Sequence, residues 1–174
     1  TVEGAVSAFL GIDIQQHAEQ NQYKLTKTGL VDKILKATNL SACNGKPTPC
    51  SPDGKTLGSD KDGPAADQEW NYASVIGMLL YLAGNSRPDI SFAVHQAARF
   101  THAPKASHEK AVVRICRYLK ATRDEGLVLQ PSNKLKVDCY VDADFGGLFG
   151  AEDSMDPMCA KSRTGFVVML ANCP

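Results

Sequence analysis

The sequence predicts an α+β protein, because the two ends of the chain alternate like strands whereas its middle has the periodicity of helices. Apolar and polar residues alternate over 10–14 and again over 135–143, which is the period of a strand with one buried face. Between 72 and 119, apolar residues recur every three or four positions, as they do in packed helices. With 174 residues, of which 43% are hydrophobic and 22% charged, the chain is long enough to bury a core.

The first unit predicted is a strand, a second strand and a helix. Residues 10–14 form the first strand, a polar turn follows at 15–22, and a returning strand is expected near Tyr23. A helix beginning near Thr28 then buries one apolar face. The buried face of the first strand is expected to carry Leu10, Ile12 and Ile14, and that of the helix Leu30, Ile34 and Leu35.

Residues 41–67 contain four prolines among Gly, Ser, Asp and Lys, and they show no apolar period. Loops of this length without structure of their own are uncommon inside a compact domain. The segment is therefore predicted to be a linker or a long surface loop that crosses between two lobes.

Three helices are predicted to follow this segment. The first runs over 69–83, and the second runs over 90–100 with Asp89 as the cap or charge at its start. Pro104 ends the next connection, and Ser107 is the expected N-cap of the third helix. The apolar stripe of that third helix is assigned to the core, and it consists of Val112, Ile115, Cys116 and Leu119.

The last elements predicted are strands. A short strand follows Gly126 at 127–129, and the alternating strand 135–143 is expected to pair with the apolar run 164–171 in a hairpin. The residues between the two hairpin strands contain several glycines and acids.

Charge is unevenly distributed along the chain, although its net value is zero. Residues 87–123 carry eight Lys or Arg against two acids, a balance of +6, whereas 138–156 carry six acids and no base, a balance of −6. A basic segment followed by an acidic one suits a protein that binds a polyanion in one place and metal ions in another. The alternative is two solvated surfaces of opposite sign.

One face of the third helix is a candidate nucleic-acid interface. Lys110, Arg114 and Arg117 are spaced at i, i+4 and i+7, which aligns three cations along the helix. Phosphate contacts there would contribute salt-dependent affinity through counterion release. An ordinary solvated face has the same spacing, so both interpretations remain open at this point.

The strand 135–143 is a candidate metal site. Asp142 and Asp144 follow the alternation that also places Asp138 and Tyr140 on one face. Close carboxylates repel one another unless a cation neutralises them, so a divalent metal would be their natural partner. A polar strand face turned to solvent is the alternative.

Other classes of site find little support. The six cysteines include no C-x-x-C pair and no cluster with histidine at zinc spacing, so reduced, mostly structural thiols are expected. No run of 18 apolar residues and no signal peptide is present, which favours a soluble intracellular protein without a membrane partner. The chain opens without Met and stops directly after a strand-like run, so we expect a piece of a longer protein.

Five ordered motifs resemble the Pol polyprotein of copia-type (Pseudoviridae) retrotransposons. They are FLGIDI at 9–14, YLAGNSRPDISFAV at 81–94, RYLKAT at 117–122, YVDADFGG at 140–147 and KSRTGF at 161–166. The resemblance implies a fragment that runs from the end of the reverse transcriptase into ribonuclease H. Residues 1–67 would be the end of the polymerase palm plus a long linker, 68–130 a helical thumb or connection region, and 131–174 the first hairpin of a ribonuclease H-like mixed sheet. Residues 148–160 form a longer spacer than is typical of the family.

The resemblance also implies a function. The parent protein would copy RNA into DNA and degrade the RNA strand of the hybrid, and its localisation would be a cytoplasmic virus-like particle and the nucleus. Asp142 would be the first catalytic acid of ribonuclease H, and Asp142 with Asp144 would bind Mg²⁺ in a two-metal site. Lys110, Arg114 and Arg117 would grip the template-primer or RNA/DNA hybrid, and the remaining parts of Pol would be partners.

No pair of adjacent aspartates occurs in the sequence, so the polymerase metal motif is missing and the fragment alone is expected to be inactive. Two other functions stay open at this stage. One is a non-catalytic nucleic-acid-binding remnant, and the other is an interaction domain with no nucleic-acid role.

Overall fold

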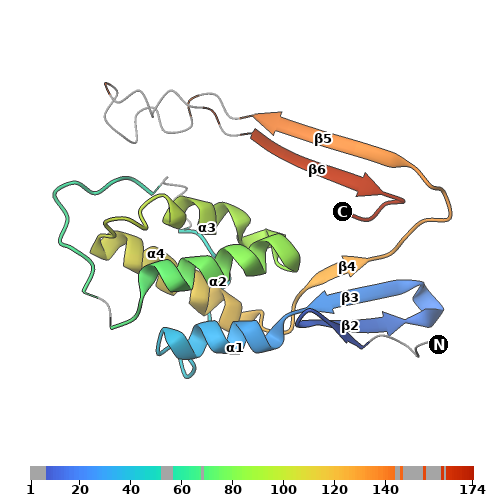
Figure 1. Ribbon diagram of the computed structural model, residues 1–174, viewed down its shortest axis with the longest axis horizontal. Coiled ribbons are helices and arrows are strands. Elements are labelled where there is room, and N and C mark those ends of the chain that lie inside the picture. Colours follow the sequence, from blue (N-terminus) through green and yellow to red (C-terminus); the bar gives the residue numbers. More distant parts are fainter. Residues whose placement is uncertain are drawn as a thin grey trace. The chain divides into compact units, whose positions relative to one another are not determined.

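The computed structural model describes residues 7–51, 57–67, 69–143, 146, 155, 162 and 164–174. These residues form four α-helices, a four-stranded sheet and a two-stranded sheet (Figure 1), so the α+β prediction is confirmed. The chain divides into two compact units, one of Thr1–Ile14 with Leu25–Leu127 and one of Gln15–Lys24 with Val128–Pro174. The assignment of ranges to palm, thumb and ribonuclease H is not decided by this division and stays a prediction.

The FLGIDI motif forms a hairpin turn, so the prediction of one continuous strand over 10–14 is wrong. Strands β1 (Ala8–Phe9) and β2 (Ile12–His17) are antiparallel, and only Leu10 and Gly11 separate them. Both turn residues have positive φ, 48° and 71°, as a tight two-residue hairpin requires. Leu10 is consequently 73% exposed instead of buried. Alternation of apolar residues cannot distinguish a strand from such a turn.

The returning strand and the helix of the first unit are confirmed, but the polar turn predicted over 15–22 is shorter, because β2 continues to His17. A 3₁₀ turn at Ala18–Gln20 leads to β3 (Gln22–Thr26), and the sheet order is β1-β2-β3-β4 with β4 at Leu127–Leu129. Helix α1 (Thr28–Ala37) begins at the expected residue. Its buried residues are Val31, Ile34 and Leu35.

Three further helices occur where periodicity predicts them. They are α2 (Tyr72–Asn85), α3 (Ser91–Ala98) and α4 (Ala106–Ala121). The side chain of Asn71 caps α2 by accepting a hydrogen bond from the backbone N–H of Ser74 at 2.8 Å. Asp89 lies in the 3₁₀ turn Pro88–Ile90 that precedes α3 and makes no side-chain cap of that helix.

The start of α4 differs from the prediction, because Ser107 is not the N-cap. The helix is preceded by Lys105, whose backbone N–H donates to Nδ1 of His108 at 2.9 Å. The hydroxyl of Ser107 instead donates to the Asp60 carboxylate at 2.5 Å. The hydroxyl that was expected to cap the helix is therefore bonded to Asp60, which lies 47 positions earlier on the loop.

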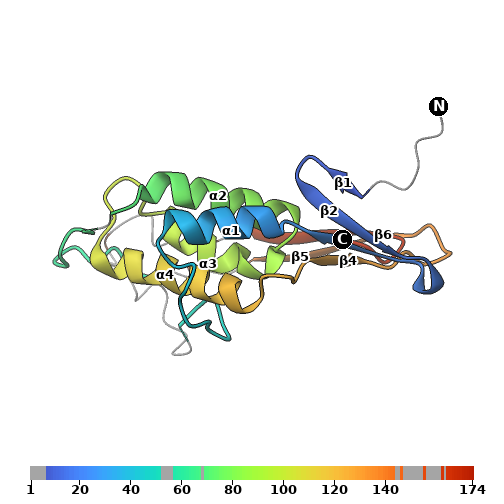
Figure 2. The same ribbon diagram turned by 90° about the horizontal axis from the view of Figure 1, so that it is seen from below.

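One core joins the four helices. Each helix packs against the next and α4 packs back against α1 (Figures 1 and 2). The apolar stripe predicted for α4 is buried in this core, and Cys116 is wholly inaccessible. Burial raises the pKa of the Cys116 thiol to about 12, as suits a structural thiol. None of the helices in the described part of the chain is long and apolar enough to cross a membrane.

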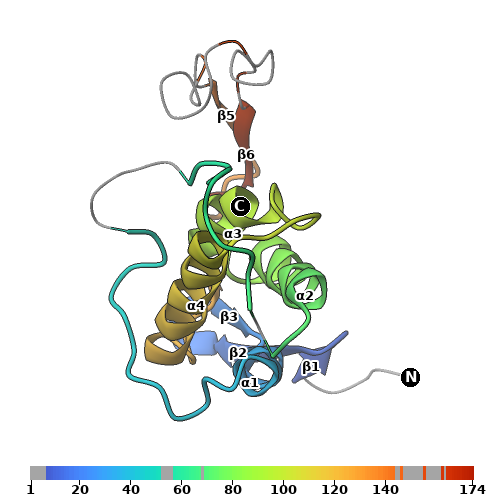
Figure 3. The ribbon, with the colours of Figure 1, turned by 90° about the vertical axis from the view of Figure 1, so that its left-hand side faces the viewer.

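The loop over 41–67 lies along α4 in its described parts, 41–51 and 57–67, and belongs to the same unit as the helices (Figure 3). Its backbone bonds to both ends of the helix. Lys46 N–H donates to the Arg117 carbonyl at 3.1 Å, and Ala106 N–H donates to the Pro64 carbonyl at 3.0 Å. The predicted crossing between two lobes is therefore wrong. The described parts of the loop are held by these hydrogen bonds and by Cys50 and Leu57, which are partly buried against the helical core.

The predicted hairpin is confirmed, with β5 (Val137–Ala143) antiparallel to β6 (Thr164–Leu170). The register runs from Val137 opposite Leu170 to Ala143 opposite Thr164. Because side chains alternate across a strand, one face of the hairpin is entirely without charge. The side chains on this face are those of Val137, Cys139, Val141, Ala143, Thr164, Phe166, Val168 and Leu170.

Candidate nucleic-acid interface

The three cations predicted to bind phosphate all line one cavity. Lys110, Arg114 and Arg117 of α4 line a hollow of about 640 Å³, together with residues of α3 and of the loop. Lys46 adds a fourth cation, which the sequence analysis missed. Among the lining residues, Glu109 is the one acid. We call this hollow the cationic cavity.

Apolar side chains also line the cationic cavity. Phe92 and Ala93 contribute from α3, Val113 and Ile115 from α4, and Leu57 from the loop. Phe92 is 59% exposed, whereas Ile115 belongs to the core beneath. A lining that combines cations with apolar side chains suits a ligand that carries both an anionic and an apolar part.

Two of the cations also hold the loop in place. Arg114 donates from Nε to the Cys50 carbonyl at 2.7 Å and from Nη2 to the Thr48 hydroxyl at 2.8 Å. Arg117 donates from Nε to the carbonyl oxygen of Asn44 at 2.7 Å. These bonds do not use all five N–H donors of each guanidinium, so both groups retain the capacity to contact a phosphate. Phosphate binding itself stays a prediction.

The two lysines differ from the arginines. Lys110 is exposed and Lys46 is half-buried. Within the residues that the structure describes, neither lysine forms an ion pair. Their charges are therefore not neutralised by the described acids, and they are the cations best suited to neutralise an incoming anion.

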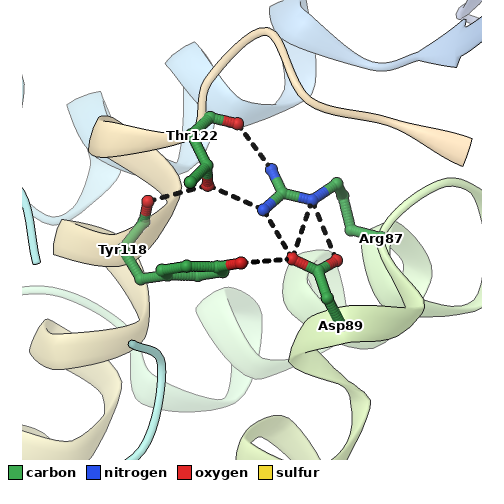
Figure 4. A network of polar contacts seen from close by, with 4 residues as sticks. All are labelled: Arg87, Asp89, Tyr118 and Thr122. Atoms are coloured by element: carbon green, nitrogen blue, oxygen red, sulfur yellow. Dashed lines mark hydrogen bonds and ion pairs between the residues drawn. The ribbon is translucent and has the colours of Figure 1, made fainter. Parts of the chain in front are cut away.

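A network of polar contacts around the buried Arg87 joins α4 to the corner between α2 and α3 (Figure 4). The guanidinium of Arg87, 2% exposed, donates to both Asp89 carboxylate oxygens, at 2.7 Å from Nη2 to Oδ2 and 3.0 Å from Nε to Oδ1. It also donates to the carbonyl of Thr122 at 2.8 Å and to its hydroxyl at 2.7 Å. The Tyr118 hydroxyl completes the set by donating to Asp89 at 2.8 Å.

This network joins two of the motifs singled out in the sequence. Arg87 and Asp89 lie in YLAGNSRPDISFAV, whereas Tyr118 and Thr122 lie in RYLKAT. Arg87 also meets the carbonyl end of α4, where the helix dipole favours a cation. The two motifs thus together orient α4, the helix that carries Lys110, Arg114 and Arg117. Neither motif revealed this pairing, because the contacts join residues 29 and 35 positions apart.

Asp89 makes part of the stability of this network dependent on pH. Burial raises the pKa of its carboxyl, but hydrogen bonds from Arg87 and Tyr118 outweigh burial and hold that pKa below its usual value. A carboxyl with a lowered pKa in the folded state stabilises the protein above its unfolded pKa, and this contribution is lost as the pH falls below about 4. We expect the free energy of unfolding to decrease over that interval, measured by urea denaturation at successive pH values. The Asp89→Asn variant should be less stable at neutral pH and show a shallower decrease.

The predicted metal site is only partly described. Asp142 is exposed on β5, and its Oδ1 accepts a hydrogen bond from the Ala143 backbone N–H at 2.9 Å. Asp138 shares this strand face but is paired with Lys136 at 2.7 Å. Asp144 lies outside the described residues. Among the residues with described positions, no three His, Cys, Asp or Glu side chains come together in a group that could hold a metal ion.

Relatives of the chain are transposon proteins. It is 33% identical over 171 residues to the retrovirus-related Pol polyprotein from transposon RE1 of Arabidopsis thaliana, covering 95% of this chain and 10% of that protein. It is 29% identical over 178 residues to the putative transposon Ty5-1 protein YCL074W of Saccharomyces cerevisiae, covering 98% of this chain and 52% of that protein. A third relative, the retrovirus-related Pol polyprotein from transposon TNT 1-94 of Nicotiana tabacum, is 29% identical over 170 residues, which are 94% of this chain and 12% of that protein.

The chain thus spans about a tenth of the length of the RE1 and TNT 1-94 polyproteins and about half of the Ty5-1 protein. No protein-family model and no solved structure matches it.

Proposed function

We propose that this chain, which belongs to the retrovirus-related Pol polyproteins of copia-type transposons, grips the template-primer duplex for an RNA-directed DNA polymerase with ribonuclease H activity. In this proposal residues 1–67 close the polymerase palm, 68–130 form the thumb or connection region, and 131–174 begin ribonuclease H. The whole polyprotein would copy RNA into DNA and degrade the RNA strand of the hybrid. Its other parts would be partners of this chain.

One observation supports the proposed binding of the duplex. Lys46, Lys110, Arg114 and Arg117 converge on a single cavity with one acid among its lining residues. A hybrid duplex exposes phosphates along both strands and is recognised chiefly through its backbone and shape. Cations held on a packed helix suit such recognition, because their spacing is set before the duplex binds.

The fixed position of α4, which carries three of the four cations, supports the same function. The core fixes the apolar side of α4, and the Arg87 network fixes its carboxyl end. Arg114 and Arg117 bond to the loop, which orders their side chains in advance. Less side-chain entropy is then lost when a phosphate is bound.

The grip is tested by removing the two lysines that take no part in the described ion pairs. The Lys46→Gln/Lys110→Gln variant leaves Arg114 and Arg117 to hold the loop, and the backbone N–H of Lys46 remains available to Arg117. We expect the slope of log affinity for an RNA/DNA hybrid against log salt concentration to become shallower by about 2, because two phosphate contacts are lost.

The matched control is Lys33→Gln/Lys36→Gln, which removes the same charge from exposed positions of α1. Its slope should stay close to that of the unmodified chain. Equal slopes for both double variants would show that binding follows net charge alone and would contradict a specific grip.

For the second unit we propose the opening hairpin of a ribonuclease H fold, with Asp142 as its first acid. Carboxylate oxygens are the ligands that Mg²⁺ prefers, and two such ions would activate water for hydrolysis in the complete enzyme. The uncharged hairpin face supports a place in a larger sheet, since Val137, Val141 and Phe166 are each more than 60% exposed. An isolated two-stranded hairpin is marginally stable, so further Pol elements would cover this face.

A further inference from the structure

We infer that the outer edge of β6 is an interaction surface, and that its partner is β6 of a second copy of this chain, paired antiparallel across a two-fold axis. The association goes beyond the proposed grip on nucleic acid and is independent of it, because β6 carries no charged residue and takes no part in the cationic cavity.

Hydrogen bonds at the end of the hairpin show which backbone groups of β6 face outward. The Ala171 backbone N–H donates to the Lys136 carbonyl at 2.8 Å, so Ala171 faces the β5 side. Successive residues of an antiparallel strand direct these groups to opposite sides. Those of Leu170 therefore face away from β5, and they bond to Cys173 instead. The same alternation directs the N–H and C=O groups of three more residues to the outer edge. They are Thr164, Phe166 and Val168.

The two edges of the hairpin are not equally protected. At the outer edge of β5, the backbone N–H of Ala143 is already bonded to the carboxylate of Asp142 at 2.9 Å. β5 also carries the charge of Asp138. Charges and blocked donors are means by which edge strands avoid pairing with other chains. Over Thr164–Val168 β6 has neither a charge nor a described partner on its outer side, so its edge is the one open to a further strand.

The composition of β6 favours such an addition. Its sequence, TGFVVML, contains no proline, and its β-branched and aromatic residues are typical of segments that add to an existing sheet. Phe166 and Val168 are exposed on one face of the hairpin, and Val167 is exposed on the other. Because an isolated two-stranded hairpin is marginally stable, a further strand at this edge would stabilise it.

A second copy of β6 fits the edge because the pattern of outward groups is self-complementary. One antiparallel register sets Phe166 opposite Phe166 of the second copy, and Thr164 of each chain opposite Val168 of the other. Every pair then joins residues that face the shared edge, so each pair exchanges two hydrogen bonds. A register displaced in one direction would set Thr164 opposite Leu170, whose groups already bond to Cys173. Displacement in the other direction would leave Val168 beyond the end of the partner strand.

Charge and symmetry also favour a second copy as the occupant. The shared edge would bring no like charges together, and the two Phe166 rings would form a cross-strand aromatic pair. In the sheet that the structure describes, the other edge of β6 is paired with β5. Two copies joined by their β6 edges therefore close into a dimer with two-fold symmetry and do not continue into a fibre through this edge.

Sedimentation velocity of the full chain from micromolar to millimolar concentration should show a monomer–dimer equilibrium. Amide hydrogen exchange read by NMR then locates the contact. The outward N–H groups of Phe166 and Val168 should exchange about 10-fold or more slowly in the dimer than in the monomer. Those of Cys139 and Val141, which face outward on β5, should exchange equally fast in both.

A pair of lysine variants distinguishes the edge from the uncharged face of the hairpin. Phe166→Lys should weaken dimerisation about 10-fold or more, because two like charges replace an aromatic pair at the shared edge. Val141→Lys is the matched control, since Val141 lies opposite Phe166 on the same face but on the far strand. Its dimerisation constant should change less than about 2-fold, because the added charges are distant from each other and screened.

A pair of proline variants tests the backbone without adding charge. Val168→Pro removes one outward N–H from β6, and Cys139→Pro removes one from β5 at the position opposite Val168. Only Val168→Pro should abolish dimerisation. Slow exchange of the Val167 N–H, which faces β5, checks that each variant keeps the hairpin, and the lysine pair decides the test if a proline variant loses it.

Three results would overturn the inference. The first is a chain that stays monomeric up to millimolar concentration. The second is an equal loss of dimerisation in Phe166→Lys and Val141→Lys, which would place the contact on the uncharged face and not at the edge. The third is slowed exchange of Cys139 and Val141 in the dimer, which would assign the contact to β5.

Discussion

Replacing Arg87 with methionine is expected to lower the free energy of unfolding by roughly 2–4 kcal/mol. Methionine fills much of the same volume but donates no hydrogen bond, so the Thr122 carbonyl loses its bond from Arg87 and the Asp89 carboxylate keeps only the bond from Tyr118 among those of the network. Removal of one member of a buried ion pair typically costs about 3–5 kcal/mol, and we expect less here because the Asp89 side chain is 40% exposed. Urea denaturation measures the change.

The control for this variant is Arg123→Gln. Arg123 is also paired with an acid, Asp32, but both side chains are substantially exposed, at 37% and 50%. Exposed pairs contribute little, so this variant should lose much less stability than Arg87→Met. Equal losses would mean that the Arg87 network does not anchor α4 and that its motifs have another role.

The second large effect expected is the absence of nuclease activity. Two-metal hydrolysis needs carboxylates from several elements, and among the described acids Asp142 stands outside any metal-binding cluster. Incubation of the chain with Mg²⁺ or Mn²⁺ and a labelled RNA/DNA hybrid should leave the RNA strand intact. Cleavage by the chain that disappears in Asp142→Asn would show that this chain suffices for catalysis and would contradict the account.

Periodicity predicted most of the secondary structure, because the helices bury regular faces and the hairpin strands alternate apolar and polar residues even though their apolar face is exposed. The three central helices and the pairing of β5 with β6 follow from apolar spacing alone. The strand predicted over 10–14 and the N-cap predicted at Ser107 were wrong for a different reason. The turn at Leu10 depends on a backbone conformation, and the cap at Ser107 depends on the distant Asp60, and neither leaves a periodic signal.

The candidate interface was predictable only in part, for a similar reason. Spacing along one helix is sufficient to group Lys110 with Arg114 and Arg117. Lys46 could not be added, since it reaches the cavity on a loop without periodicity. The bonds from Arg114 to that loop span 64 and 66 positions, so they too required the three-dimensional structure.

Lysine acetylation read by mass spectrometry locates a bound hybrid on the helical unit. The chain is acetylated with and without saturating RNA/DNA hybrid at low salt, and the rate at each lysine is compared. We expect the hybrid to slow acetylation of Lys46 and Lys110, whereas Lys33 and Lys36 on α1 react as before. Equal protection of all four lysines, or protection of α1 alone, would contradict it.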